Sequence, residues 1–375
     1  MKKRVVIIGC GFAGFYAARR LSKYRDILEL TVIDQRGTFD FLPLLPDILG
    51  RGINAGCLSS SIEELGRKSG FNFIKDEVIS VDIKNKVIHT PNININYDYL
   101  IISSGAETNY YGKDVIKDYA FSIDSVSDIK KALDGLKNGH YSAYLISGGG
   151  YTGVEVATNL RRYLDNNSAN KKVVIIEKSP SILGALPQWM RDYAVSNLKK
   201  LKIDIFTDTS IDRIEGGKIV LSGGQEYDNL MLFWVAGVKT AGYIQDLKVD
   251  KNPQGRVKVD KFLKVSESCF VVGDCAYIAY QNSFLRMAVQ FSIYEALCAA
   301  DNIIRSIKSR KLKIYQPMDL GYIIPMGNNQ SCGRVLGINF KGLLPTLMHF
   351  IMCFYRLEGF KNKIGLLKAL LKGGF

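Results

Sequence analysis

The chain has 375 residues, of which 47% are apolar and 23% charged, values close to those of ordinary globular proteins. This length predicts two or three domains at roughly 150 residues each, and the composition excludes general disorder. The formal charge of +14 favours an anionic partner, which is a nucleic acid, an anionic lipid or a phosphate-bearing cofactor. Nucleic acid is excluded because no zinc-finger spacing and no basic cluster with interleaved aromatic residues occurs.

The cysteines and histidines give no pattern of a disulfide scaffold or a metal site. The seven cysteines are odd in number and widely spaced, and the three histidines lie far apart in the sequence. We therefore expect no metal, and a reducing compartment. No signal peptide is expected, because a strand begins almost at the first residue. The longest apolar run, Leu343 to Tyr355, is shorter than the ~18 residues that a spanning helix needs.

The first predicted elements are a strand, a glycine-rich turn and a helix. Residues 5–9 read Val-Val-Ile-Ile-Gly, the turn is Gly9 to Gly14, and the helix runs to about Lys23. A second strand, Leu30 to Ile33, ends at Asp34. This is G-x-G-x-x-G in strand–turn–helix context with an acid at the expected distance, and it predicts a dinucleotide site.

Each residue type in this motif has a physical role. Gly9 permits the tight turn, Gly11 lets the backbone approach a pyrophosphate, and Gly14 lets helix and strand pack closely. The N-terminus of the helix offers unpaired N–H groups to the phosphates. Asp34 is expected to accept hydrogen bonds from a ribose.

The same pattern returns in the middle of the chain. A strand from Ala143 to Ser147 leads into Gly148-Gly149-Gly150-Tyr151-Thr152-Gly153 and a helix. The next strand, Lys172 to Ile176, ends at Glu177. An acid here accepts from both ribose hydroxyls and repels a 2′-phosphate, so it favours NADH over NADPH, although Lys178 beside it opposes this preference. The alternative is that Glu177 is a solvated acid at a strand end.

Two dinucleotide motifs in one chain indicate two dinucleotides, and a flavin with a nicotinamide nucleotide is a chemically useful pair. Two more strands end in small-residue turns of the kind found beside a cofactor. The first ends at Ser104-Gly105 and the second at Ala236-Gly237.

A short strand, Cys269 to Val272, precedes Gly273-Asp274. With both glycine motifs, this turn resembles the two-dinucleotide flavoprotein family of pyridine-nucleotide oxidoreductases. The resemblance implies bound FAD with Asp274 on its ribityl chain. Disulfide exchange is disfavoured, because disulfide reductases of this fold carry a cysteine pair soon after the first motif or in the NAD domain, whereas here only Cys57 lies near the first place and no cysteine occurs from residue 58 to 268.

The whole chain resembles type II NADH dehydrogenases, which are single-subunit NADH:quinone oxidoreductases. The resemblance implies an FAD enzyme of the respiratory chain that passes electrons from NADH to a membrane quinone without pumping protons. It also implies a peripheral protein on the cytoplasmic face of the cell membrane. The matching stretches are Gly9–Gly14, Phe41–Leu45, Gly150–Glu155, Trp234–Val238, Gly273-Asp274 and Gly359–Lys363.

The family's quinone motif, Ala-Gln-x-Ala-x-Gln, falls on Val289 to Tyr294 with one departure. Gln290 is kept, whereas the second glutamine is replaced by Tyr294, whose hydroxyl can still bond a quinone carbonyl. The alternative for Gln290 is a helix residue bonded to backbone. Glu155 lies in a first helical turn, where it complements the helix dipole or else acts near the nicotinamide or as a proton relay.

The predicted site residues form three sets. Those assigned to catalysis are Glu155, Gln290 and Tyr294. Those assigned to FAD are Gly9, Gly11, Phe12, Ala13, Gly14, Asp34, Gln35, Arg36, Leu44, Val78, Ser104, Gly105, Gly273, Asp274, Val289 and Gln290. Those assigned to NADH are Gly148, Gly150, Tyr151, Thr152, Gly153, Glu177, Ala236 and Gly237.

The C-terminal segment from Leu343 to Phe375 has five basic residues and one acid. At helical spacing its last turns present one apolar face, with lysines opposite and Lys363 as an exception. Such a basic amphipathic helix is typical of a bilayer surface, and the alternative is an ordinary helix packed on the core. The residues of the apolar face are Ile364, Leu366, Leu367, Leu370 and Leu371, and His349 in the preceding apolar stretch is expected at the lipid interface.

The expected fold class is α/β, with two Rossmann-like domains for FAD and NAD and a C-terminal amphipathic membrane-anchoring module. Residues 1–110 and 239–330 form the expected FAD domain, residues 111–238 the NADH domain, and residues 331–375 the membrane module. The segment from Asn92 to Asn96 alternates polar and apolar residues and predicts an edge strand.

Three other functions remain open. A sulfide:quinone-type oxidoreductase would use Cys332 and Cys353. A flavin- and NADH-binding protein could instead sense redox state for a partner. A soluble NADH:ferredoxin-type reductase is disfavoured by the hydrophobic tail. The identity of the quinone and the oligomeric state, a homodimer included, are not determined by the sequence.

Overall fold

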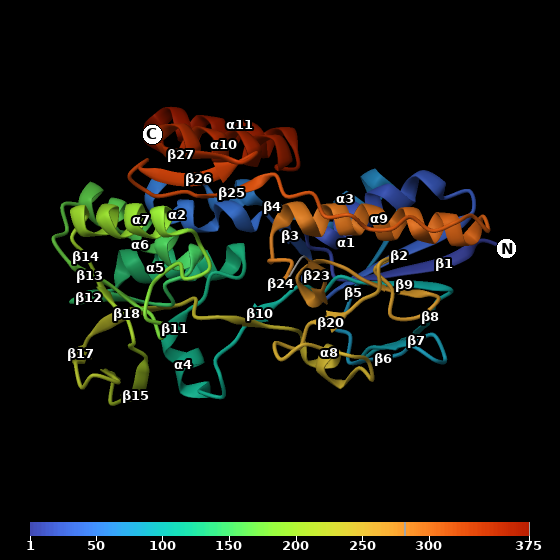
Figure 1. The fold of residues 1–375 in the computed structure, drawn as a ribbon, viewed down its shortest axis with the longest axis horizontal. Coiled ribbons are helices and arrows are strands. Elements are labelled where there is room, and N and C mark those ends of the chain that lie inside the picture. Colours follow the sequence, from blue (N-terminus) through green and yellow to red (C-terminus); the bar gives the residue numbers. More distant parts are fainter. Residues whose placement is uncertain (281–282, 375) are drawn as a thin grey trace. The chain divides into compact units, whose positions relative to one another are not determined.

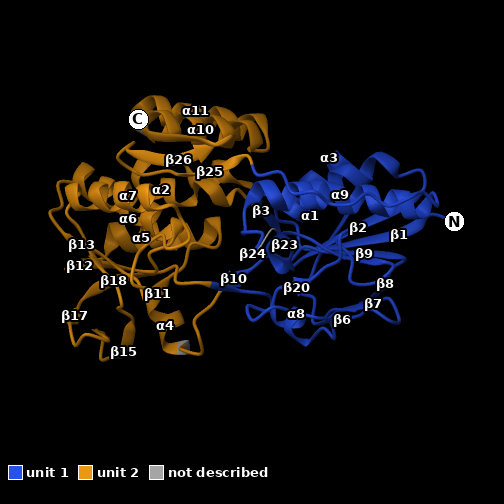
Figure 2. Ribbon diagram, viewed as in Figure 1, with its two compact units in different colours: residues 1–39, 60–107, 238–319 blue, residues 40–59, 108–237, 320–375 orange. Residues whose placement is uncertain are grey.

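The computed structural model describes residues 1–280 and 283–374, and the chain has an α/β fold (Figure 1). The described residues group into two compact units, coloured separately in Figure 2. Unit 1 comprises residues 1–39, 60–107 and 238–319, and unit 2 comprises residues 40–59, 108–237 and 320–375. The grouping differs from the expected domain boundaries at residues 40–59 and 320–375, which fall in the unit that contains the second glycine motif.

Unit 1 is built on a five-stranded parallel sheet whose strands are buried on both faces. Its order is β21 (Cys269–Val271), β9 (Tyr99–Ile102), β1 (Lys3–Ile8), β2 (Leu28–Asp34) and β5 (Asn72–Lys75). The β-branched run in β1 suits this setting, because a parallel sheet covered by helices has no solvated face. Helix α1 (Phe12–Leu21) connects β1 to β2, and α9 (Val289–Ile307) packs against it, with an ion pair of 2.7 Å between Arg20 and Asp301.

A small antiparallel sheet in unit 1 contains the predicted edge strand. Strand β8 (Asn94–Asn96) pairs on one side with β7 (Val87–His89), which pairs in turn with β6 (Ser80–Asp82). The edge-strand prediction is therefore confirmed for three of its five residues. The remaining elements of unit 1 are α3 (Ile62–Ser69), α8 (Gly242–Asp246), β20 (Val257–Lys258), β22 (Ala276–Tyr277), β23 (Ala279–Tyr280), β24 (Ser283–Phe284) and the 3-10 turns Ser22–Tyr24 and Gly273–Cys275.

Unit 2 repeats the parallel arrangement. Its main sheet has the order β11 (Ala120–Phe121), β18 (Leu230–Trp234), β12 (Ala143–Ser147), β13 (Lys172–Ile176) and β14 (Ile203–Phe206). The helices of this part are α4 (Asp114–Tyr119), α5 (Val126–Asn138), α6 (Tyr151–Asn166) and α7 (Gln188–Lys200). A three-stranded antiparallel sheet joins β15 (Ile211–Glu215), β16 (Lys218–Leu221) and β17 (Glu226–Asp228).

Helix α2 (Leu45–Arg51) also belongs to unit 2 and packs closely against α6. A Cβ atom on Gly50 would lie 2.5 Å from the carbonyl oxygen of Asn159, so only glycine allows this approach. Short turns, Leu42–Leu44 and Ala55–Leu58, flank α2. Three short strands lie at the chain crossings between the units: β3 (Thr38–Asp40), β4 (Ser59–Ser61) and β10 (Glu107–Thr108), the last paired with β19 (Val238–Lys239).

The C-terminal part of unit 2 is a β-meander followed by two helices. The strands are β25 (Gly321–Ile324), β26 (Ser331–Val335) and β27 (Ile338–Gly342), and the helices are α10 (Leu343–Arg356) and α11 (Phe360–Ala369), with a last turn at Leu370–Gly374. Among the described helices, none is both long enough and apolar enough to cross a membrane. A Cβ atom on Gly365 of α11 would lie 2.2 Å from the Sγ of Cys57, so these two residues are in direct contact.

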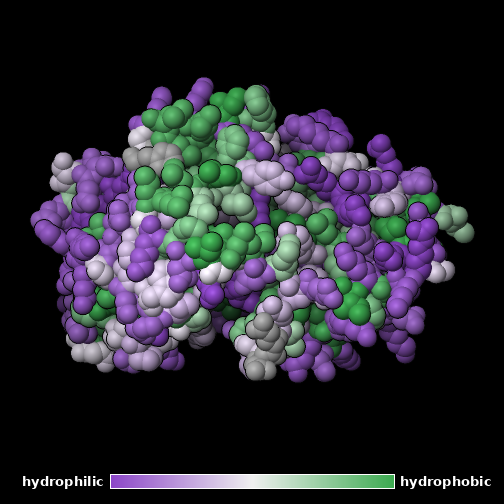
Figure 3. Space-filling view, turned by 45° about the horizontal axis from the view of Figure 1, so that its top comes forward, coloured by the Kyte–Doolittle hydropathy of each residue, from purple (hydrophilic) through white to green (hydrophobic). Residues whose placement is uncertain are grey.

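The predicted single apolar face of the last helix is divided in the structure. Leu366 and Leu370 are buried against the rest of unit 2, whereas Ile364, Leu367 and Leu371 are exposed. The helical period predicted which residues share a face of the helix. It could not predict that part of this face packs against the rest of unit 2. Figure 3 shows hydrophobic side chains gathered over this part of the surface.

Candidate functional site

The first glycine loop joins β1 to α1 in unit 1. Gly9 has φ +90°, and a Cβ atom there would lie 2.5 Å from the carbonyl oxygen of Ser103. A Cβ atom on Gly14 would lie 1.8 Å from the carbonyl oxygen of Gly9, whereas one on Gly11 would meet no atom within 4 Å. Two glycines are thus required by packing and the third borders open space. Gly11 precedes α1 without a side-chain cap among the described residues, so the helix offers N–H donors to an anion.

Asp34 lies against this loop from the end of β2. Its carboxylate accepts hydrogen bonds of 2.7 Å from the N–H groups of Cys10 and Arg36. The side chain of Arg36 approaches to 3.7 Å, and Gln35 and Arg36 are exposed. The acid therefore fixes the conformation of the loop at the edge where the sequence predicts the FAD ribose.

The other residues assigned to FAD lie in several surroundings. Phe12 and Ala13 are buried at the start of α1, and Val78 packs in the hydrophobic core of unit 1. The hydroxyl of Ser104 forms a short hydrogen bond with the buried hydroxyl of Tyr243, and Gly105 has φ +67° beside open space. Leu44 is fully buried and belongs to unit 2.

The second glycine loop reproduces the first in geometry. Gly148 has φ +115°, and a Cβ atom there would lie 2.6 Å from the carbonyl oxygen of Val235. A Cβ atom on Gly153 would lie 1.8 Å from the carbonyl oxygen of Gly148, and one on Gly150 would meet no atom within 4 Å. These three glycines therefore correspond in turn to Gly9, Gly14 and Gly11.

Glu177 holds the second loop as Asp34 holds the first. Its carboxylate accepts hydrogen bonds from the N–H groups of Gly149, at 2.7 Å, and Ser179, at 2.8 Å. Nearby, the Tyr111 hydroxyl donates to the carbonyl oxygen of Ala236 at 3.1 Å and lies next to Gly237. Tyr151 and Thr152 are partly exposed in the first turn of α6.

The Gly273-Asp274 turn follows β21 at the carboxyl edge of the unit 1 sheet. Gly273 has φ +76°, a conformation that favours glycine. Burial raises the pKa of Asp274, while the nearby Arg256 and a hydrogen bond from Ser292 oppose the rise. A buried carboxyl in this position needs a polar partner.

Helix α9 carries the residues that the sequence assigns to quinone. Val289 is its first residue, and Tyr294 is partly exposed. The buried Gln290 donates from Nε2 to the Oδ1 of Asp319 at 3.1 Å, and Asp319 forms a two-pronged ion pair of 2.5 and 2.8 Å with Arg286. The amide of Gln290 thus bonds to a side chain, and not only to backbone as the alternative expected.

Unit 2 contains a buried charged cluster, made of Asp47, Arg51, Glu155 and His349, that the sequence analysis largely missed. Asp47 Oδ1 lies 2.8 Å from Arg51 Nε, and Asp47 Oδ2 lies 3.5 Å from His349 Nε2. The guanidinium of Arg51 also lies 4.9 Å from the ring centroid of Phe350. The one available sequence signal was an acid and a base at i, i+4 in the otherwise apolar stretch from Leu42 to Arg51.

The ionisable groups in this cluster shift one another's pKa values. Burial raises the pKa of Asp47, but His349 and Arg51 outweigh it, so the net pKa is lowered. Burial opposes a charge on His349, yet Cys353 and Asp47 hold its pKa well above the ordinary value. Burial raises the pKa of Glu155 to about 8, against the attraction of His349 and with the repulsion of Asp47.

The expectation that His349 sits at a lipid interface is wrong. The side chain is buried in an ion pair with an acid about 300 positions earlier in the chain. Periodicity within α10 could not identify a partner on another helix.

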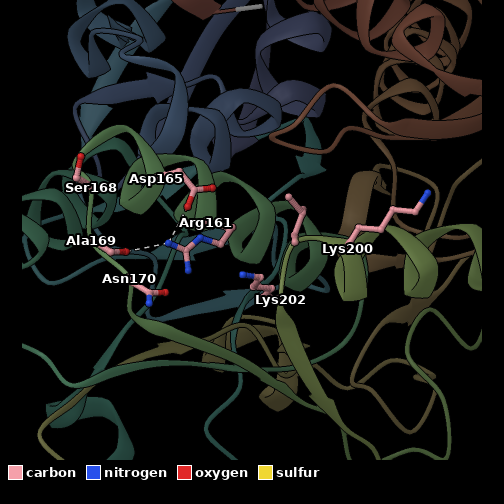
Figure 4. Close-up of a pocket in the computed structure, with 8 residues that line it drawn as sticks. Arg161, Asp165, Ser168, Ala169, Asn170, Lys200 and Lys202 are labelled. Carbon is pink, nitrogen blue, oxygen red and sulfur yellow. Dashed lines mark hydrogen bonds and ion pairs between the residues drawn. The ribbon is translucent and has the colours of Figure 1, made fainter.

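A surface cavity of about 340 Å³ lies elsewhere on unit 2 (Figure 4). Its lining residues precede β13 and β14, at the amino ends of these strands, and Arg161 there bonds to the carbonyl oxygen of Ala169 and to Asp165. Ligands of parallel sheets bind at the carboxyl ends, where the glycine loop follows β12. This cavity is therefore not the nucleotide site.

Residues 3–301 match the pyridine nucleotide-disulphide oxidoreductase family. The chain belongs to this family. This match confirms the resemblance to the pyridine-nucleotide oxidoreductases that the sequence predicted. The curated relatives described next carry names that agree with it.

Two curated relatives of the chain are similar over nearly its full length. Demethylphylloquinone reductase NdbB of Synechocystis is 24% identical and aligns over 97% of this chain and 94% of its own. A type II NADH:quinone oxidoreductase of Staphylococcus saprophyticus is 24% identical over 100% of this chain and 99% of its own.

Solved structures show the same fold. NDH2 from Plasmodium falciparum, in complex with NADH, superimposes with a TM-score of 0.88 at 18% identity, covering 99% of this chain and 98% of its own. The sulfide:quinone oxidoreductase from Aquifex aeolicus superimposes with a TM-score of 0.80 at 19% identity, covering 97% and 92%.

Cys332, one of the two cysteines that the sulfide-oxidising alternative would use, does not offer a reactive thiol. All seven are free in the described residues, and Cys332 and Cys353 are buried. Burial raises the pKa of Cys332 to about 12, which keeps it a thiol at neutral pH. Because the thiolate is the nucleophile, this residue is poorly suited to attack a disulfide.

Proposed function

We propose that the chain is an FAD-dependent oxidoreductase that takes a hydride from NADH and passes electrons to a membrane quinone without pumping protons. The observation that carries the proposal is the pair of glycine loops with matching geometry, each held by an acid at the end of the next strand. Relatives named NADH:quinone oxidoreductases match the chain along its whole length and support the electron acceptor.

The residues of unit 1 fit a bound FAD. Open space borders Gly11 and Gly105, and the N-terminus of α1 presents N–H donors suited to a pyrophosphate. Asp34 and the partly exposed Asp274 provide acceptors for ribose and ribityl hydroxyls. Bound FAD supplies the hydride acceptor and the electron donor that no side chain can provide.

The second loop is the proposed NADH site. Gly150 leaves room for a pyrophosphate, and the N-terminus of α6 offers donors to it. The carboxylate of Glu177 would accept from ribose hydroxyls and repel a 2′-phosphate, which explains the expected preference for NADH. Ala236 and Gly237 border the same loop at the end of β18.

Quinone reduction needs protons as well as electrons, and Glu155 is the proposed proton donor. Its pKa of about 8 keeps the carboxyl protonated at neutral pH, while an ordinary glutamate would be ionised. Tyr294 and Gln290 on α9 are the proposed quinone contacts, and Asp319 orients the amide of Gln290.

Helices α10 and α11 are the proposed membrane-facing surface, on the cytoplasmic side of the cell membrane. Their exposed apolar side chains are visible together in Figure 3. Basic residues of the same segment would attract anionic headgroups. The exposed apolar residues are Leu343, Leu344, Leu347, Ile351, Met352, Phe354, Tyr355, Phe360, Ile364, Leu367 and Leu371.

One assay tests the function directly. Purified protein is expected to be yellow, to release FAD on denaturation, and to oxidise NADH in detergent with a ubiquinone or menaquinone analogue as acceptor. Purified protein that contains no flavin would contradict the proposed function. Slow turnover with every quinone, together with a long-lived reduced state, would favour the redox-sensing alternative.

A further inference from the structure

Glu295 is a buried acid beneath the Gly273-Asp274 turn, and the proposed function gives it no role. It lies on α9, and its side chain is 4% exposed. Its Oε2 accepts a hydrogen bond of 2.6 Å from the N–H of Gly273. The turn also packs against the first glycine loop, because a Cβ atom on Gly273 would lie 3.1 Å from the Cβ of Ala13.

Two acids and one base meet at this turn. Arg256 is buried and donates from Nη2 to the carbonyl oxygen of Ala276 at 2.6 Å, and its charge acts on both Glu295 and Asp274. Burial raises the pKa of Glu295 to about 8, and the repulsion of Asp274 adds to the rise, against the Gly273 hydrogen bond and the attraction of Arg256. Burial raises the pKa of Asp274 as well.

The other titratable groups that interact with Glu295 are neutral at pH 7. Burial raises the pKa of Cys275 to about 12 and that of Cys298 to about 11, and it raises the pKa of Tyr315 further. The charge balance of the turn is therefore set by Glu295, Asp274 and Arg256. Two neighbouring carboxylates repel each other, and Glu295 is the more deeply buried of the two because Asp274 is partly exposed, so the proton is favoured on Glu295.

We propose that Glu295 is a positioning residue for FAD, which holds the proton of this acid pair so that Asp274 stays ionised and accepts the hydrogen bonds of the ribityl hydroxyls. The inference rests on the proposed function, because it assumes that FAD binds at this turn. A protonated Glu295 still accepts from Gly273 through its carbonyl oxygen, so the turn keeps its shape. Ionisation of Glu295 above pH 8 would place a second negative charge beside Asp274 and weaken flavin binding.

Release of FAD from the holoprotein tests this inference without reference to turnover. Flavin fluorescence after dilution gives the dissociation constant between pH 6 and pH 9 at constant ionic strength. For the natural protein we expect affinity to fall about tenfold from pH 7 to pH 9, the change for one unfavourable neighbouring charge. Glu295→Gln imitates the protonated acid and is expected to bind FAD as the natural protein does at pH 7, with no change up to pH 9.

A second variant tests the hydrogen bond. Glu295→Leu removes the acceptor and leaves the buried Gly273 N–H without its partner, so we expect about tenfold weaker FAD binding at every pH. Asp301→Asn is the matched control, because it removes a charge from the same helix at the ion pair with Arg20. It should keep the pH dependence of the natural protein.

The results separate this inference from the proposed function. If the natural protein binds FAD and oxidises NADH, but Glu295→Gln retains the full pH dependence, Glu295 does not hold the proton. Equal affinity of Glu295→Leu and the natural protein at pH 7 would also overturn the inference. Should Glu295→Leu fail to fold, Glu295→Gln still decides. A natural protein that carries no flavin overturns the proposed function, and this inference with it.

Discussion

At the scale of single residues, the two loop-holding acids occupy equivalent positions but are proposed to serve different nucleotides. Asp34 bonds the loop N–H of Cys10, and Glu177 bonds that of Gly149. Each carboxylate can both fix its loop and accept from a ribose, since an ionised carboxylate has about four acceptor sites.

Replacing Glu177 with alanine should change the choice between NADH and NADPH. Loss of a charged acceptor is expected to lower kcat/KM for NADH about tenfold or more, and loss of the repulsive charge should spare NADPH. Steady-state kinetics with both nucleotides provide the measurement, with Lys172→Ala, at the opposite end of β13, as the control. An unchanged ratio of the two kcat/KM values would mean that Glu177 only holds the loop.

Glu155 should control the pH dependence of quinone reduction. Because its pKa is raised to about 8, the proton is present below this pH and lost above it. Quinone-dependent turnover is therefore expected to fall as the pH rises through about 8, and Glu155→Gln should be slow at all pH values. Anaerobic reduction of the flavin by NADH, measured by stopped flow, should be little changed in this variant. A parallel loss in both half-reactions would contradict a specific role in proton donation.

Asp47 should be important for the stability of unit 2. Asp47→Asn leaves Arg51 and His349 without their buried counter-charge, which is expected to cost about 3–5 kcal/mol in the free energy of unfolding. Asp212→Asn is the control, because its ion pair with Arg213 is exposed and screened by solvent, so its loss is expected to leave the free energy of unfolding almost unchanged. Urea unfolding of the three proteins provides the comparison.

The same ion pair predicts how stability depends on pH. The pKa of Asp47 is lowered, so its contribution is present above the ordinary aspartate pKa and is lost as the pH falls through the folded value. The pKa of His349 is raised, so its contribution is present below the ordinary histidine pKa and is lost as the pH rises through the folded value. The pair therefore stabilises the fold between these two limits, and Asp47→Asn should remove this dependence.

At the scale of elements, the sequence predicted what local patterns determine. The strands Ala143–Ser147 and Lys172–Ile176 have the expected bounds, because an apolar run between turn residues marks a buried parallel strand clearly. The two glycine loops followed in the same way from their spacing. The roles of Asp47 and Glu295 were not predicted, because their partners His349 and Gly273 are distant in sequence and no local period encodes such pairs.

Helix α10 should attach the protein to lipid through its exposed apolar side chains. Ile351 is 67% exposed. Burial of this side chain in lipid would contribute roughly 1.5–3 kcal/mol to binding, and Ile351→Asp would remove that contribution and introduce a charge. Binding to vesicles of anionic lipid, measured by flotation, is expected to weaken at least tenfold. Ile79→Asp, which alters an exposed isoleucine of unit 1, should leave vesicle binding unchanged. Equal flotation of both variants would argue against α10 as the attachment site.

At the scale of the whole molecule, the paired glycine motifs predicted the α/β fold class with two Rossmann-like units before the structure was known, and the family match agrees with it. The segment from Asp40 to Ser59 shows what sequence order could not predict. It lies between two parts of unit 1 in the chain, yet its helix α2 packs on α6 of unit 2. The reason is the close approach at Gly50, which a reading of consecutive segments cannot anticipate.

The contact between Cys57 and Gly365 has a consequence for the end of the chain. No atom can be added between the thiol and the backbone of α11 without moving one of them. Gly365→Ala should therefore displace α11 from its seat and expose Leu366, which limited proteolysis of the tail would detect as faster cleavage. Oxidation or alkylation of Cys57 adds atoms at the same contact, and we expect it to speed cleavage of the tail as Gly365→Ala does.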